Sequence, residues 1–90
     1  MSKSIMQTEK KCYVSGATYN LDLHHCMMGT ANRKLADKYG LTVWLRHDIH
    51  MDLHDRNTEL KTQLKQDAQR AFEKKYSHDK WMEVFGINYL

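Results

Sequence analysis

The chain has 90 residues, with 14 Lys and Arg against 11 Asp and Glu, and a formal net charge of +3 at pH 7. This length suits one small domain and leaves no room for a second. The charge is mildly basic, so it permits contact with phosphates without by itself indicating a nucleic-acid surface. Its apolar runs are too short to span a membrane, and the opening MSKSIMQTEKK lacks the apolar segment of a signal peptide, so we expect a cytoplasmic protein.

The N-terminal third predicts a β-hairpin. Residues 1–10 are polar and unpatterned, and we expect them to form a flexible lead-in to a single domain over 11–90. Lys11–Val14 and Leu21–Cys26 are short runs typical of strands, and Ser15-Gly16 between them is a turn signal. The two runs are therefore expected to pair with each other.

The rest of the chain predicts mostly helices. ANRKLADKY is expected as a helix with Thr30 as its N-cap, ended by Gly40. Leu41–Leu45 is rich in β-branched and aromatic residues and predicts a further strand, and Arg46–Arg56 a short helix. Two more helices are expected after it, the first capped by Asn57 or Thr58, and the second begun by Ser77 or Asp79 and ended by Gly86. Their apolar sides are expected to carry these residues: Leu60, Leu64, Ala68, Ala71, Phe72 and Tyr76 in the first, and Trp81, Met82, Val84 and Phe85 in the second.

Five of the six histidines lie between His24 and His54, in two groups. His24 and His25 are adjacent on the expected strand, so we expect their side chains to point to opposite faces. His47, His50 and His54 stand close to one stripe of the expected helix. Imidazole is the commonest metal ligand in proteins and titrates near neutrality. The two groups therefore predict a divalent metal site beside a general base.

The arrangement suits hydrolysis of a phosphodiester. A metal held by His24, His50 and His54 would leave positions open for water and a phosphate oxygen. A neutral His25 beside it could deprotonate the attacking water. Imidazole ligands suit zinc, nickel and similar ions, whereas magnesium prefers oxygen, so zinc is the expected metal. Three basic side chains are candidates for binding the phosphate oxygens: Arg33, Lys34 and Arg46.

Two other readings of these residues stay open. Cys12 and Ser15 have the spacing of a zinc knuckle without its second sulfur, so zinc held by Cys12 and two or three of His47, His50 and His54 would join hairpin to helix. A closed site with four such ligands would be structural. Alternatively the histidines are partly buried polar residues and a solvated helix face, and Cys12 is a small buried hydrophobe.

The order of these motifs resembles the ββα-metal fold of HNH endonucleases, and most closely small phage-encoded HNH-like proteins. The likeness extends from Cys12 to Leu90 and is carried by CYVSG, LDLHH, GTANRK, YGLTVWL, HDIHMDLH and FGINYL. It implies an α+β fold, in which a β-hairpin and helices surround a metal site and a helical segment follows. The sequence lacks the paired CxxC knuckles of many members, and Asn32 is the nearest candidate for their middle asparagine.

The resemblance also implies roles for individual residues. In HNH enzymes the first residue of the hairpin pair usually binds the metal and the second is the general base. Carried over, His24 becomes a ligand and His25 the base, and on the helix His54 and His50 become ligands.

Three functions are considered in view of the resemblance. The first is a metal-dependent DNA endonuclease with His25 as general base, and its partner would be DNA. The second is a catalytically inactive, zinc-binding phage inhibitor of a host defence system, such as an anti-CRISPR protein that binds a Cas nuclease. A third is an accessory protein that binds DNA without cutting it. Each would act in the cytoplasm of a bacterial host.

Overall fold

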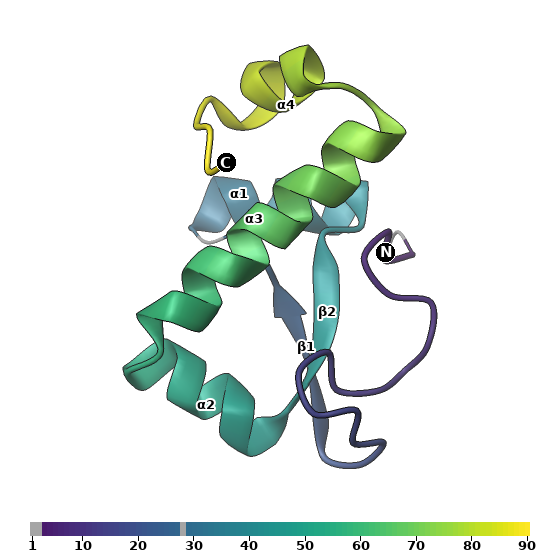
Figure 1. Ribbon diagram of the computed structural model, residues 1–90, viewed down its shortest axis with the longest axis vertical. Coiled ribbons are helices and arrows are strands. Elements are labelled where there is room, and N and C mark those ends of the chain that lie inside the picture. The colour runs from purple at the N-terminus through teal and green to yellow at the C-terminus, as the bar shows by residue number, and fades with distance from the viewer. Residues whose placement is uncertain (1–2, 28) are drawn as a thin grey trace.

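The computed structural model describes residues 3–27 and 29–90 of the chain. In chain order its elements are β1 (Leu21–His25), α1 (Thr30–Tyr39), β2 (Thr42–Arg46), α2 (His47–Asp55), α3 (Thr58–Lys75) and α4 (His78–Phe85). The two strands form one antiparallel sheet, and α1 lies in the connection between them (Figure 1). The predicted α+β class is confirmed at this level. No helix in the described part of the chain is both long and apolar enough to cross a membrane.

The expected pairing of Lys11–Val14 with Leu21–Cys26 is wrong. Lys11–Val14 is not a strand, and β1 pairs instead with β2, so that the histidine pair ends the first strand of the sheet rather than the second. Both Val43 and Leu45 of β2 are fully buried, so pairing with β2 places β1 beside the core. The Tyr13 N–H donates to the Trp44 carbonyl, which places the expected first strand along β2.

The N-terminal residues cover the edge of β2 that faces away from β1. Residues 3–10, expected as a flexible lead-in, run beside this strand (Figure 1). The Ile5 N–H donates to the Gly40 carbonyl, and the Trp44 N–H donates to Oε1 of Gln7. Gly40 ends α1 with a φ of 73°, and a Cβ built there would overlap the Lys3 carbonyl oxygen. The segment therefore provides hydrogen-bond partners for backbone groups at an otherwise open strand edge.

The core is built by the sheet, α3 and α4. Leu64, Ala68 and Phe72 of α3 are fully buried, as the apolar stripe predicted, and so is Trp81 of α4. Tyr76, expected on the same stripe, is exposed because it lies just after the end of α3. Met82 was expected to be buried with Trp81 but is exposed, because it lies on the outer side of this short helix. Three cap predictions are confirmed: the side chains of Asn57 and Ser77 cap the starts of α3 and α4, and Gly86 ends α4. Thr30, expected as the N-cap of α1, is instead its first residue, and Gly29 is the N-cap.

The C-terminal tail docks on α3. Gln69 is fully buried, and its Oε1 accepts from the Tyr89 N–H while its Nε2 donates to Oδ1 of Asn88. The indole N–H of Trp81 donates to the Ile87 carbonyl. These bonds hold α3 and α4 together, and α3 in turn packs on α2. The packing therefore fixes α2 against β1, where the histidines lie.

Candidate metal centre

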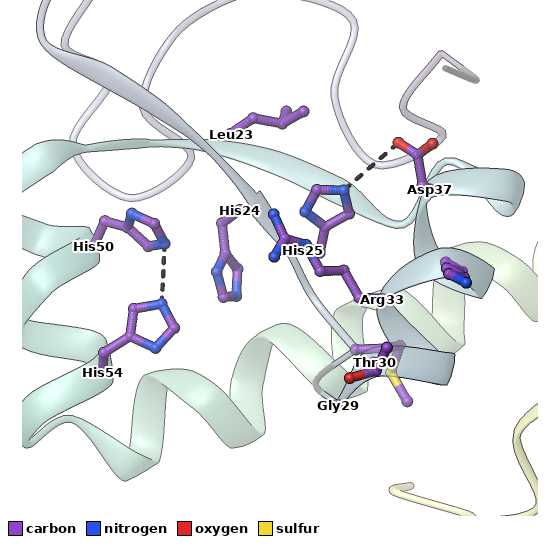
Figure 2. A pocket seen from close by; sticks show the side chains of 11 residues that line it. Leu23, His24, His25, Gly29, Thr30, Arg33, Asp37, His50 and His54 are labelled. Carbon is purple, nitrogen blue, oxygen red and sulfur yellow. Dashed lines mark hydrogen bonds and ion pairs between the residues drawn. The ribbon is translucent and has the colours of Figure 1, made fainter.

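Three histidines from two elements converge at one place (Figure 2). His24 comes from β1, and His50 and His54 lie one turn apart on α2. One ring nitrogen of each lies within 4.8 Å of the other two, and the Nε2 atoms of His50 and His54 are 3.1 Å apart. Zn–N bonds of about 2.0–2.1 Å in a tetrahedral arrangement place two ligand nitrogens about 3.3 Å apart. The three imidazoles are therefore close enough together that they could hold one metal ion.

The local fold explains why these rings meet. In β1, Asp22 and His24 are two residues apart and so project from the same face of the strand. α2 begins directly after β2, with Leu53 fully buried and Ile49 packed against the core. This anchoring turns the side of α2 that carries His50 and His54 toward His24, with ring centroids 5.3 and 5.8 Å from the His24 ring.

Burial keeps His24 neutral. The residue is 4 % exposed, and its ring makes edge contacts with the rings of His50 and His54. Burial, together with the neighbouring imidazoles of His50, His54 and His25, lowers the pKa of His24 to about 4. Burial and His50 also lower the pKa of His54. Neutral rings with available lone pairs are the form in which histidine binds a metal.

We expect the metal-free protein to lose stability as the pH falls from about 6.5 toward 4. Unfolded His24 has an ordinary pKa near 6.5, so in this window the unfolded chain binds a proton that the folded chain excludes. The full shift corresponds to about 3 kcal/mol. Urea unfolding after chelation, at several pH values, measures it, and His24→Leu should show a flatter dependence than the natural protein. Identical pH dependence in the two proteins would contradict the buried, neutral imidazole.

Asp22 orients one of the three rings. Its Oδ2 accepts hydrogen bonds from Nδ1 of His50, at 3.0 Å, and from Nδ1 of His47, at 2.7 Å. These bonds from His50 and His47 lower the pKa of Asp22, so the carboxylate stays charged. With its proton held on Nδ1, His50 presents the lone pair of Nε2 to the site. Sequence reasoning missed Asp22, although its place two residues before His24 was a usable signal.

Removing this carboxylate should weaken metal binding. We expect Asp22→Ala to lower the affinity for zinc by about 10- to 100-fold, the usual effect of losing a group that orients a ligand. Competition with a chromogenic chelator measures the change. Asp48→Ala is the matched control, because Asp48 contacts Arg46 rather than a histidine ring. Equal zinc affinities for Asp22→Ala and Asp48→Ala would refute the role of Asp22.

Cys12 and His47, also predicted as ligands, lie outside the group of three. His47 is directed to Asp22, and its side chain is 65 % exposed. Cys12 is buried, and its Sγ accepts from the Ser15 N–H. Burial raises the pKa of Cys12, but hydrogen bonds, chiefly from Ser15, outweigh it and lower the pKa to about 7. Among the described residues, the ligand set brought together is His24, His50 and His54.

The three rings line an open pocket of about 790 Å³ that α1 and β1 complete. His25 also lines it, and its Nε2 lies 3.5 Å from Oδ1 of Asp37. The two histidines of the pair thus have different partners, as expected: His24 lies with the α2 histidines, and His25 lies with Asp37 (Figure 2). The pocket therefore contains a fourth imidazole beside the ligand set but not part of it.

Two of the three predicted phosphate-binding side chains face this pocket. Arg33 and Lys34 line it from α1, and Figure 2 shows Arg33 reaching from the helix toward the histidines. Arg46 lies elsewhere, at the end of β2, where Nε and Nη2 donate to the two carboxylate oxygens of Asp48 at 2.6 and 2.9 Å. Of the predicted phosphate-binding side chains, Arg33 and Lys34 are therefore the two that line the pocket.

Comparison of the sequence with protein-family models and with curated proteins, and of the structure with solved structures, gives no match.

Proposed function

We propose that the protein is a metal-dependent DNA endonuclease with the ββα-metal arrangement of HNH enzymes. The observation that carries the proposal is the placement of His25. It lies in the same pocket as three candidate metal ligands, contacts an acid rather than those ligands, and shares the pocket with Arg33. The order β1, β2, α2, with a histidine pair ending β1 and two histidines one turn apart on α2, is compatible with that fold type.

The ligand set supports zinc or a similar ion as the cofactor. All three donors are imidazoles, and a site with three protein ligands leaves at least one position for water, as catalytic zinc sites do. A bound divalent cation would make water more acidic and stabilise negative charge on a phosphate oxygen. His24, His50 and His54 would hold it, with Asp22 orienting His50.

The remaining pocket residues account for the rest of the reaction. His25 accepts a proton from the attacking water, whose oxygen bonds to phosphorus as the bond from phosphorus to the leaving sugar oxygen breaks. The leaving oxygen takes a proton from solvent. Arg33 and Lys34 bind the non-bridging oxygens and offset the charge that develops on them.

A nicking assay on supercoiled plasmid tests the proposal. Metal-stripped protein is supplied separately with zinc, nickel, manganese or magnesium, and a His50→Ala, His54→Ala double variant from the same purification is the control. We expect open-circle product with the natural protein and none with the double variant. A protein that binds zinc but cleaves DNA with none of these ions would refute the endonuclease. If that protein also co-purified with a Cas nuclease, the inhibitor would be supported instead.

A further inference from the structure

We propose that Asp37 is a positioning residue for His25: it holds the proton on Nε2 and leaves Nδ1 as the basic nitrogen toward the pocket. The inference rests on the proposed role of His25 as general base. It adds a residue that the sequence did not single out and that is not part of the candidate metal centre.

The contact joins two elements at the rim of the pocket. Asp37 lies in the last turn of α1, and His25 is the last residue of β1. Oδ1 of Asp37 is 3.5 Å from Nε2 of His25, and both side chains line the pocket. Figure 2 shows Asp37 approaching the His25 ring from the side away from His50 and His54. The contact is an ion-pair distance rather than a hydrogen bond. A carboxylate at this distance repels a lone pair on Nε2 and attracts an N–H there, so it favours the neutral tautomer with the proton on Nε2 and the lone pair on Nδ1.

Asp37 has two basic neighbours on α1 besides its contact with His25. Arg33 and Lys34 precede it by four and three residues on α1, the spacings at which opposite charges pair along a helix. All three residues line the same pocket, and Oδ1 of Asp37 lies 3.5 Å from Nε2 of His25. The carboxylate of Asp37 therefore interacts with His25, while Arg33 and Lys34 face the space where phosphate would bind.

The helix dipole does not favour an acid at the position of Asp37. A negative charge in the last turn of a helix is disfavoured by the helix dipole, which favours cations such as Lys38 there. The Asp37 side chain is 38 % exposed, so replacing it by alanine opens no cavity. Loss of this carboxylate should therefore leave the fold intact, and its position is explained by the contact with His25.

The pairing would serve the reaction in two ways. An acid that fixes the tautomer of a histidine and supports its protonated form is a recurrent arrangement behind general bases. In addition, holding His25 toward α1 keeps its ring out of the ligand set, so the cation retains an open position.

The test combines a spectroscopic and a kinetic measurement on Asp37→Ala and Asp37→Glu. Glu83→Ala is the matched control, because Glu83 is an acid on α4 that pairs with Lys80 outside the pocket. Long-range proton–nitrogen NMR of zinc-loaded protein at mildly alkaline pH reports which nitrogen of His25 carries the proton. We expect Nε2 in the natural protein and the Glu83 variant, and a mixture of tautomers in Asp37→Ala.

In the nicking assay, kcat of Asp37→Ala should fall about tenfold or more, with KM for the plasmid and the thermal midpoint unchanged, and Asp37→Glu should recover part of the loss. A proton on Nδ1 of His25 in the natural protein, or an unchanged tautomer in Asp37→Ala, would overturn the inference. An inactive natural protein with the expected tautomers would refute the endonuclease and leave the positioning role of Asp37 supported.

Discussion

Alanine in place of His25 should slow plasmid nicking by about 10²- to 10⁴-fold while the protein still binds zinc. His25 lies outside the ligand set, so its removal leaves the three donor nitrogens in place. General-base catalysis contributes about 10²- to 10⁴-fold to such reactions, so the rate constant should fall by that order. Single-turnover nicking and zinc titration of the same preparation measure the two effects separately.

His78→Ala is the control for His25→Ala. His78 is a histidine at the start of α4 whose Nδ1 contacts Glu73, and it does not line the pocket. Its removal should change neither nicking nor zinc binding. Nicking by His25→Ala at the natural rate would remove His25 from the mechanism. Loss of zinc from His25→Ala would instead make it a ligand, and the division of roles within the histidine pair would be refuted.

Zinc should raise the thermal midpoint of the protein by about 15–30 °C. The candidate site joins β1 to α2, so a bound cation would tie together elements that are far apart in the unfolded chain. At about a thousand times its Kd, a ligand that binds only the folded state stabilises it by about 4 kcal/mol. In a domain of this size, 1 kcal/mol shifts the midpoint by about 4–8 °C. Thermal unfolding followed by circular dichroism, with and without zinc, measures the shift.

The same experiment on His24→Ala is the control for the zinc effect. Without its β1 ligand the site retains only the two histidines of α2, and a cation bound by one helix cannot join it to the strand. The large shift should therefore disappear. A midpoint that zinc leaves unchanged in the natural protein, or that it raises equally in His24→Ala, would contradict a cation bridging β1 and α2.

The helices were predictable because their signals are local. The apolar spacing along α3, the caps at Asn57 and Ser77 and the left-handed glycines at 40 and 86 lie within a few residues of what they determine. Strand pairing is not local. Lys11–Val14 is as close to β1 in sequence as a hairpin requires, but β2 carries the buried Val43 and Leu45, and that burial decides which segment pairs with β1.

The same distinction applies to the site. The residue type and helical spacing of His50 and His54 were enough to predict that they act together, and the structure brings His24 to them. Sequence could not show that His47, on nearly the same stripe, would turn to Asp22, or that α1 would bring Asp37 to His25. These contacts depend on how α1 and α2 pack on β1, which no short stretch of sequence encodes.

Calorimetric titration of zinc into the natural protein and single alanine variants tests the central claim most directly. We predict one zinc per chain, with binding lost or greatly weakened in the alanine variants of His24, His50 and His54. Cys12→Ala should bind as the natural protein does. Tight zinc binding that survives the loss of His24, or that disappears with Cys12, would contradict the convergence of these three imidazoles on one cation.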